Sequence, residues 1–368
     1  ALTIAALSPP AEENRLPETR AVTPRTSLFR PDVAALSTER AVELGRGFVD
    51  SILASDPRLS IDNASFSVWQ VAHAIRSTAG AEASEADAGV SFSVMGMALG
   101  EGGEVGGFHY TGDTLRDLSK LDEALERARA EFADVALGNL GGGAADSYVG
   151  PVVFSPAAFA AVFLQPLHAA CSALAVQRGR SAMAGKLGER IAVPEFSLID
   201  DPTDVELSGA GSFDREGVAC GRFPIVERGV LRSYLYNGLA ARIEDRASTG
   251  HASGGARSIP GLGAHALCVA GGDGGTKDEL LARMGRGLYV ERFSGTVDPS
   301  SGDFSGVAKS SRWVEGGGCV RSVGETLLAG NAFRLLAGSV VLGSEPERQG
   351  GSLRAPAVLV DGVSVTAG

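Results

Sequence analysis

A glycine-rich break at Gly138–Gly143 separates two stretches of chain with different hydrophobic periodicities. Before it, an amphipathic helix is predicted over Asp113–Leu137, because the apolar residues recur at alternating spacings of three and four. These residues are Leu118, Leu121, Leu125, Ala128, Phe132 and Val135. After the break, short alternating runs predict many strands. Because clustered glycines interrupt regular structure, we place a domain boundary here, between an N-terminal domain (1–144) and a C-terminal domain (145–368).

The N-terminal domain is predicted to be an antiparallel sheet with helices. A helix is expected over Leu36–Ala54, with Ser37 or Thr38 as its N-cap. Alternating apolar residues predict three strands that form an antiparallel meander, at Ser65–Arg76, Gly89–Leu99 and Val105–Thr111. Asp113 is expected to cap the amphipathic helix that follows.

The C-terminal domain is predicted to be strand-rich and barrel-like. It opens with a strand at Pro151–Phe154, and Ser155 is the expected N-cap of an apolar helix that runs to about Gln177. Hairpins are predicted at two turn dipeptides, Arg228-Gly229 and Asp361-Gly362. Because helices mix with antiparallel strands, the fold class is α+β.

The charge balance argues against nucleic acid as a direct partner. The chain has 33 Lys and Arg residues against 44 Asp and Glu residues, a formal net charge of −11 at pH 7. A chain this acidic repels phosphate backbones.

Neither a leader nor a membrane span is expected. Residues 1–35 carry scattered charges and prolines instead of an apolar core. Prolines and polar residues interrupt the longest apolar stretch, Val152–Val176, which favours a buried helix over a membrane span. Four cysteines lie far apart without a CxxC pair, which is typical of reduced thiols in a cytoplasmic protein. They are Cys171, Cys220, Cys268 and Cys319.

Motifs for common chemistries are incomplete. Gly179–Leu187 resembles a phosphate-binding loop, but its glycines are one residue too far apart. Leu187 also stands where a Mg²⁺-binding hydroxyl is required. The histidines are scattered, so a zinc site built from this chain alone would need long-range convergence. They are His73, His109, His168, His251 and His265.

Two acidic groups and one loop remain as candidates. Carboxylates in Asp200–Pro202 and Phe213–Gly217 could bind metal or act as acid and base. Asp and Pro also punctuate turns at strand ends, which is the favoured interpretation. The Gly/Ser-rich loop at Ser248–His251 is a common setting for function and equally for ordinary turn residues. These residues alone leave the function open.

Longer segments of the second half form an ordered set. They are GPVVFSPAA (150–158), AGKLGERIAVPEFSLIDDP (184–202), FDREGV (213–218), VERGVLRSYLYN (226–237), STGHA (248–252), GLYVERFSG (287–295), SGDFSG (301–306), AGNAFRLL (329–336) and APAVLVDGVSVTAG (355–368). Together they resemble the TldD/PmbA family, also called modulators of DNA gyrase. The resemblance covers residues 145–368 well and the preceding meander loosely.

The family has two branches, and the resemblance implies the branch without metal. TldD-type chains bind zinc for peptide hydrolysis through an HExxxH helix and a late cysteine, which PmbA/TldE-type chains lack. Aligned through Gln177–Ser181, the two ligand positions fall on Leu164 and Ala169, and the acid/base position falls on Gln165. Leu and Ala cannot bind zinc, and Gln cannot take a proton from metal-bound water as Glu does. No cysteine follows Cys319.

The resemblance therefore implies a PmbA/TldE-like subunit with no cofactor of its own. A TldD-like HExxxH partner would supply zinc, and a homodimer is expected where that partner is absent. The pair would hydrolyse unfolded or modified peptides, or an amide-containing natural-product intermediate. Five residues match motifs shared by both branches and are expected at the subunit interface or the wall of the substrate chamber. They are Asp214, Glu216, Ser248, Thr249 and His251.

Two other functions stay open at this point. One is a non-enzymatic modulator that binds another protein, in line with the gyrase-modulator name. The other is a stand-alone hydrolase that uses different residues, such as Cys171 or the carboxylates of residues 200–216.

Overall fold

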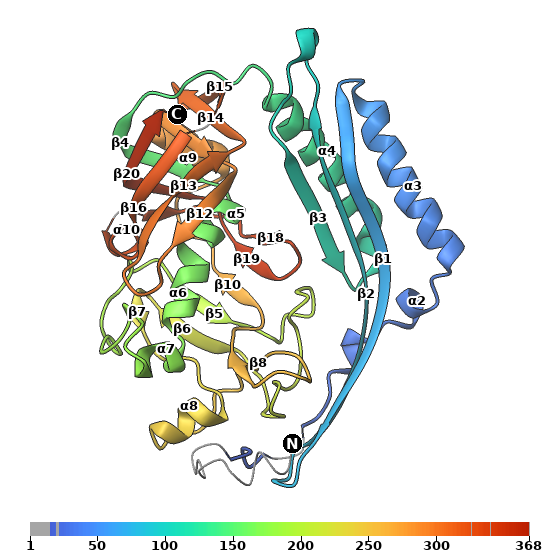
Figure 1. The fold of residues 1–368 in the computed structure, drawn as a ribbon, viewed down its shortest axis with the longest axis vertical. Helices are drawn as coiled ribbons and strands as arrows, with labels where there is room; N and C mark the ends of the chain where they lie inside the picture. Colours follow the sequence, from blue (N-terminus) through green and yellow to red (C-terminus); the bar gives the residue numbers. More distant parts are fainter. Residues whose placement is uncertain (1–14, 20–21, 325, 339, 368) are drawn as a thin grey trace, which may run out of the picture.

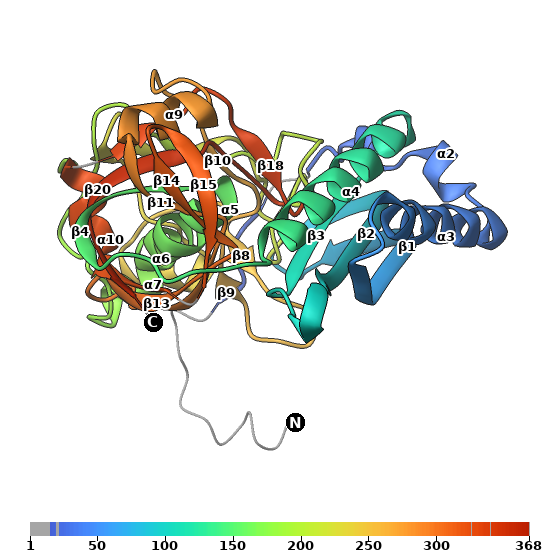
Figure 2. The ribbon, with the colours of Figure 1, turned by 90° about the horizontal axis from the view of Figure 1, so that it is seen from above.

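The chain folds into two bodies that lie side by side. The structure, a computed structural model, describes residues 15–19, 22–324, 326–338 and 340–367. One body is a long, narrow sheet with helices, drawn in blue to teal in Figure 1, and the other is a thicker strand-rich body, drawn in green to red. Figure 2 shows α4 running along the side of the sheet that turns toward the strand-rich body.

The regular elements have the following bounds. The helices are α2 (Pro31–Ala34), α3 (Thr38–Ser55), α4 (Leu121–Gly138), α5 (Pro156–Phe159), α6 (Gln165–Ala170), α7 (Ala173–Gln177), α8 (Gly238–Ile243), α9 (Lys277–Met284) and α10 (Ala332–Gly338). The strands of the first body are β1 (Leu59–Arg76), β2 (Glu82–Ala98) and β3 (His109–Leu115). Those of the second body are β4 (Tyr148–Phe154), β5 (Leu198–Asp200), β6 (Phe223–Glu227), β7 (Val230–Leu231), β8 (Ala252–Ser253), β9 (Gly261–Leu262), β10 (Leu267–Val269), β11 (Arg286–Val290), β12 (Arg292–Val297), β13 (Asp303–Lys309), β14 (Ser311–Glu315), β15 (Gly318–Val323), β16 (Thr326–Asn331), β17 (Val340–Leu342), β18 (Glu347–Gln349), β19 (Leu353–Ala355) and β20 (Val358–Ala367).

The first body is an antiparallel sheet in the order β1-β2-β3, as the alternating pattern predicts. Its inner face packs on α3 and α4, and the ring of Phe48 in α3 lies 5.3 Å from that of Phe92 in β2. The backbone N–H of Arg40 donates to the Ser37 hydroxyl, which confirms Ser37 as the N-cap of α3. The predicted Ser65–Arg76 strand is longer than expected, because pairing with β2 already starts at Leu59.

The predicted capping role of Asp113 is wrong. Asp113 lies inside β3, and α4 begins only at Leu121. The alternation of buried residues in β3 continues through Leu115. Asp113 is therefore part of the strand, and a helix can begin only after Leu115. The buried Asp113 carboxylate instead forms ion pairs with Arg127 of α4 and Arg348 of β18, and thereby ties the two bodies together.

The second body is a curled half-barrel, which confirms the strand-rich, barrel-like prediction. Among the described residues its larger sheet has nine strands, with β4 between β20 and β11. A six-stranded sheet, ordered β18-β19-β10-β5-β6-β7, lies beside it. Within the hydrophobic core, the ring of Phe163 lies 5.6 Å from that of Phe154 and 6.4 Å from that of Phe304.

The apolar segment after β4 is a buried helical run, as predicted, but it is not one continuous helix. The Ser155 hydroxyl accepts the backbone N–H of Ala158 and caps α5. A π-helical turn at Ala160–Leu164 separates α5 from α6. The helix is then interrupted at Cys171 and Ser172, and α7 begins at Ala173. Among the described residues, no helix has both the length and the apolar character needed to cross a membrane.

The two predicted hairpins have different outcomes. Arg228-Gly229 is a true hairpin turn, with positive φ at both residues, although β7 is shorter than expected. Asp361-Gly362 is not a hairpin. It forms a bulge inside the single strand β20, which pairs with β4 on both sides of it. The φ of Gly362 is +87°, and an Asp-Gly pair provides this geometry equally well for a bulge and for a turn.

Candidate functional site

A cleft of about 480 Å³ lies between the two bodies. β3 and α4 form one wall, and α6 and the β18–β19 hairpin contribute to the other. Charged side chains of both signs line it: Asp113, Arg127, Glu131, Glu291, Arg292, Glu347 and Arg348. A larger groove of about 680 Å³ runs between α3 and β1, but it is lined mainly by apolar and small side chains. The cleft is therefore richer in charged side chains than the groove is.

Buried carboxyl groups give the cleft its electrostatic character. Burial raises the pKa of Glu291, and the hydroxyl of Tyr289 donates to this carboxylate at 2.7 Å. Burial and the neighbouring Glu291 also raise the pKa of Glu347. These two carboxyl groups therefore favour the protonated form more than free glutamates do.

The helix that borders the cleft cannot hold zinc at the positions that the motif requires. The side chain of Leu164 is fully buried in the hydrophobic core. Gln165 reaches into the cleft from the start of α6, and Ala169 offers only a methyl group. Neither ligand position has a donor atom, so the residues present do not fit the metal of an HExxxH helix.

His168 misses the second ligand position by one residue, and the structure gives it a different partner. It borders the cleft, and its Nε2 accepts the backbone N–H of Ala264 at 2.8 Å. Burial lowers the pKa of His168, so the neutral ring that accepts this bond is favoured. The helix therefore anchors the loop between β9 and β10, in which His265 follows Ala264 directly.

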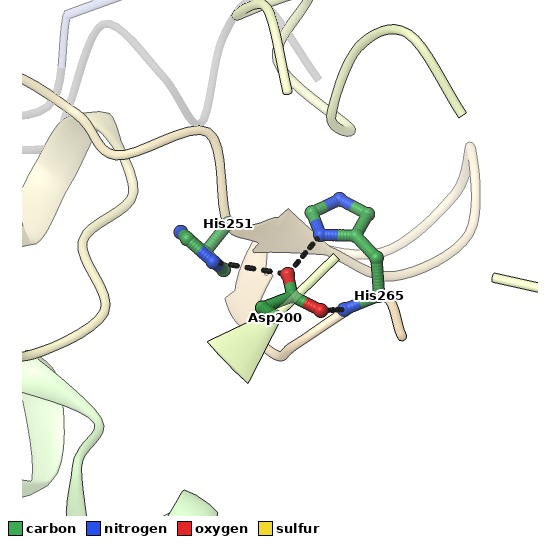
Figure 3. Close-up of side chains that lie close together, drawn as sticks. All are labelled: Asp200, His251 and His265. Atoms are coloured by element: carbon green, nitrogen blue, oxygen red, sulfur yellow. Dashed lines mark hydrogen bonds and ion pairs between the residues drawn. The ribbon is translucent and has the colours of Figure 1, made fainter. Parts of the chain in front are cut away.

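That loop is part of a buried cluster of Asp200, His251 and His265 (Figure 3). Asp200 ends β5, His251 directly precedes β8, and His265 lies between β9 and β10. The His265 Nδ1 atom lies 2.9 Å from Asp200 Oδ2, and the His251 Nε2 atom lies 3.1 Å from the same oxygen. The side chain of Asp200 is fully buried, that of His251 is 2% exposed and that of His265 is 17% exposed.

Backbone groups hold the second oxygen of Asp200. Its Oδ1 accepts the N–H of His265 at 2.9 Å and that of Ala266 at 2.6 Å. Burial alone would raise the pKa of Asp200, but its contacts with His251 and His265 outweigh burial and hold the pKa well below the ordinary range. The carboxylate is therefore charged, and its free oxygen faces both imidazole rings.

Polar partners also orient the outer nitrogens of both rings. The Nδ1 atom of His251 lies 2.7 Å from the hydroxyl of Thr249. The Nε2 atom of His265 lies 3.4 Å from the thiol of Cys220. Each ring is thus fixed from outside the cluster, while its inner nitrogen lies close to Asp200 Oδ2 (Figure 3).

The other predicted site residues support the loops around this cluster. The buried carboxylate of Asp214 accepts the backbone N–H groups of Glu216, Val218 and Ala252. Glu216 accepts the N–H of Gly238 at 2.7 Å. Burial raises the pKa of both carboxyl groups. Asp214 therefore fixes the strand that follows His251, and Glu216 fixes the start of α8.

Ser248 and Thr249 fasten the His251 loop to one backbone unit. The hydroxyls of both residues lie within 3.1 Å of the Tyr236 carbonyl oxygen, and the Thr249 hydroxyl also accepts the N–H of Tyr236. The side chain of His251 is buried, whereas the sequence left open that it was an ordinary surface turn residue.

Sequence reasoning missed two members of the cluster. The sequence around Asp200 favours a turn, and His265 is one of five scattered histidines. A signal existed at Asp200, because a carboxylate that directly follows the apolar strand residues Leu198 and Ile199 is placed at a buried strand end. No local signal existed at His265, whose partner is 65 residues away.

The chain is similar in sequence and in fold to known proteins. The family model described as the PmbA/TldA metallopeptidase C-terminal domain matches residues 147–367, more than half of the chain. Residues 147–367 thus form a domain of the metallopeptidase-like class, and the chain belongs to the PmbA/TldD family.

Relatives by sequence come from archaea and bacteria. Uncharacterized protein MJ0231 of Methanocaldococcus jannaschii is 32% identical over 222 residues, which are 60% of this chain and 51% of that protein. A metalloprotease PmbA homolog of Haemophilus influenzae is 29% identical over 199 residues, which are 54% of this chain and 42% of that protein. The matched part is thus about half the length of these curated relatives.

Solved structures agree over nearly the whole chain. A putative modulator of a DNA gyrase from Thermotoga maritima has a TM-score of 0.84 and 25% identity, and the match covers 97% of this chain and 80% of that one. TldE from Thermococcus kodakarensis has a TM-score of 0.86 at 21% identity, and the match covers 99% of this chain and 82% of that one. The second likeness is one of fold.

Proposed function

We propose that this chain is the TldE-like subunit of a heterodimeric peptidase whose TldD-like partner carries the hydrolytic zinc. The observation that supports this proposal is the helix beside the cleft. Its ligand positions are a fully buried leucine and an alanine, Leu164 and Ala169, and Gln165 stands at the acid/base position. A helix of this composition can wall a chamber but cannot activate water.

The cleft would then be this subunit's share of the chamber that holds the substrate. Guanidinium groups of Arg127 and Arg348 and carboxyl groups of Glu131 and Glu291 line it together. Such a mixture offers donors and acceptors to the backbone of an extended chain and selects for no single charge. We infer an unfolded or modified peptide as substrate, or an amide-containing natural-product intermediate of similar shape.

A stand-alone hydrolase has one observation in its favour, the alignment of Cys220, His265 and Asp200. This order of thiol, imidazole and carboxylate is that of a catalytic triad. Burial and the carboxylates of Asp214 and Asp200 raise the pKa of the Cys220 thiol, which disfavours the nucleophilic thiolate. Cys171, the other candidate, is fully buried, and burial raises its pKa to about 12. The subunit proposal is therefore preferred.

The test is co-expression with a TldD-type chain that carries the HExxxH motif. We expect a stable complex that contains both chains, and peptide hydrolysis by the complex that a chelator abolishes. The chain alone should be inactive, and the variants Gln165→Glu and Cys220→Ser should leave both results unchanged.

Three outcomes would overturn the proposal. Hydrolysis by the isolated chain that is lost in Cys220→Ser would support the stand-alone hydrolase. A stable complex without hydrolysis of any peptide would support a protein-binding modulator. Failure to form any complex would rule out the heterodimer.

The four unpaired cysteines fit a reducing compartment, and we propose a cytoplasmic location for the pair.

A further inference from the structure

We propose that Asp200, His251 and His265 form a binding site for a divalent transition-metal ion, with zinc as the favoured ion. The site is separate from the helix that carries the family's metal motif. One carboxylate oxygen and two imidazole nitrogens, all within 4.8 Å of one another, form a donor set that suits zinc and the neighbouring first-row ions.

The orphaned nitrogen of His251 is the first argument. Its ring is 2% exposed, and Nε2 has no hydrogen-bond partner among the described residues. It lies 3.1 Å from Asp200 Oδ2, but not along a direction that makes a hydrogen bond. A buried polar atom without a partner is costly, so it indicates a missing ligand. A cation that binds both atoms does not need to lie on the line between them.

The outer hydrogen bonds are the second argument, because they are complete when both inner nitrogens carry lone pairs. His251 Nδ1–H then donates to the Thr249 hydroxyl, which also accepts the N–H of Tyr236 and donates to the Tyr236 carbonyl oxygen. His265 Nε2–H donates to the Cys220 sulfur, and the Cys220 thiol donates to the carbonyl oxygen of Gly250. In this state every outer donor has an acceptor, and three electron-rich atoms face one another.

The distances suit an ion after a small movement of the rings. Ligand atoms around a tetrahedral zinc ion with bonds of about 2.0 Å lie about 3.3 Å apart. The two nitrogen–oxygen distances of 2.9 and 3.1 Å are already close to this value. The contacts to Thr249 and Cys220 are the kind of outer interaction that orients metal-binding histidines.

An open coordination position has a route to solvent. His265 borders the cleft and also a second hollow of about 390 Å³, which Phe213, Asp214 and Gly263 help to line. Three protein ligands with one accessible position are typical of zinc sites that bind water or a substrate group. The expectation of a chain without metal rests on the helix and the late cysteine, and neither belongs to this site.

The test measures metal binding and does not depend on a partner subunit or on peptide hydrolysis. The full-length chain is stripped with a chelator and titrated with Co²⁺, whose visible absorption reports coordination, and zinc is then counted by elemental analysis. We expect one equivalent of either ion per chain. A failure of the heterodimer proposal would leave this result untouched.

Two variants separate an ion from a hydrogen-bonded cluster. His265→Asn and His251→Gln keep an N–H close to the position of the inner nitrogen, so they preserve hydrogen bonding and the fold, but amide nitrogens bind zinc poorly. Each should weaken Co²⁺ binding by at least about 100-fold, beyond the range of about 10–100-fold for the loss of an orienting partner. Thr249→Val should weaken it by about tenfold, and Thr249→Ser should restore it.

His73→Gln is the matched control. His73 borders the same hollow as His265, and its side chain is half exposed, outside the cluster. Circular dichroism confirms that each variant is folded. The proposal is wrong if the folded chain binds no equivalent of Co²⁺ or Zn²⁺, or if His265→Asn and His251→Gln bind these ions as tightly as His73→Gln does.

Discussion

The helix beside the cleft and the Asp200 cluster are opposite cases of how chemistry is placed in a fold. On the helix, the two ligand positions of the motif lie within one short segment, and their residues, Leu164 and Ala169, have no donor atoms. In the cluster, Asp200, His251 and His265 come from three separate segments and converge on one oxygen. His168 connects the two regions, because its side chain extends from the helix and accepts the N–H of Ala264 in the loop of His265. The absence of donor atoms at two helix positions therefore does not mean that reactive side chains are absent elsewhere in the fold.

The sharpest contrast is expected between the removal of Asp200 and the removal of Gln165. Asp200→Ala leaves the backbone N–H groups of His265 and Ala266 without their acceptor and removes the carboxylate that faces both imidazoles. It should lower the free energy of unfolding by about 3–5 kcal/mol. Gln165→Ala, at an exposed position, should change it by less than about 0.5 kcal/mol. Urea unfolding followed by circular dichroism measures both, and equal effects would contradict the contrast.

Rebuilding the motif on the helix should not recreate its chemistry. The triple variant Leu164→His, Gln165→Glu, Ala169→His places an imidazole where a leucine is fully buried. The free energy of unfolding should fall by about 2–4 kcal/mol, and the zinc content should not rise above that of the unmodified chain. Thermal unfolding and elemental analysis test this expectation. Ala169→His alone, at a half-buried position, is the milder control. An additional equivalent of zinc in a stable triple variant would refute the expectation.

The connection through His168 can be tested by removing its acceptor atom. His168→Ala leaves the half-buried N–H of Ala264 unpaired, at a cost of about 1–2 kcal/mol. Amide hydrogen exchange at Ala264 should become faster by a corresponding factor. His168→Gln, which retains an acceptor near Nε2, should exchange at nearly the original rate. Unchanged exchange in His168→Ala would separate the helix from the cluster.

The smallest expected effect is a pH dependence that belongs to the cleft. Burial raises the pKa of Glu291, so its protonated form stabilises the fold below the ordinary glutamate pKa. This contribution is lost as the pH rises through the raised pKa. The stability of the unmodified chain relative to Glu291→Gln should therefore fall by about 1 kcal/mol between about pH 4 and about pH 8.

Asp56 provides a control of opposite sign for this pH dependence. Its hydrogen bonds with Arg58 lower its pKa to about 2. Its contribution is therefore present above the ordinary aspartate pKa and is lost as the pH falls toward 2. Denaturant unfolding of Asp56→Asn between about pH 2 and about pH 4, and of Glu291→Gln between about pH 4 and about pH 8, should show the two opposite trends. The same trend in both variants would contradict the assignment.

Local sequence patterns predict correctly those features that depend on interactions between residues close in sequence, such as helix caps. Ser37 caps α3 because a short polar side chain before an apolar periodic stretch has few other roles. Asp113 was assigned wrongly because a carboxylate before a helix also fits the end of a strand, and pairing with β2 decided between them. Asp361-Gly362 was assigned wrongly because its backbone geometry suits a turn and a bulge alike.

The candidate site also has a part that the sequence can predict and a part that it cannot. The sequence alone shows which side chains stand at Leu164, Gln165 and Ala169, because these positions lie on one short segment. It predicted a role for His251 as part of a loop but not its contact with Asp200. That contact depends on sheet pairing between residues far apart in sequence, which no window of local sequence contains.

The bulge in β20 has a consequence for how the second body is built. β20 pairs with β4 on both sides of the bulge, with β17 before the bulge and with β16 after it. β4 ends at Phe154, and β20 begins at Val358. The half-barrel thus cannot close until segment 358–367 has been synthesised, and the early strands must wait with unpaired edges. Pairing across such a sequence separation makes folding slow, and a chaperone that shields β4 during synthesis would address this exposure.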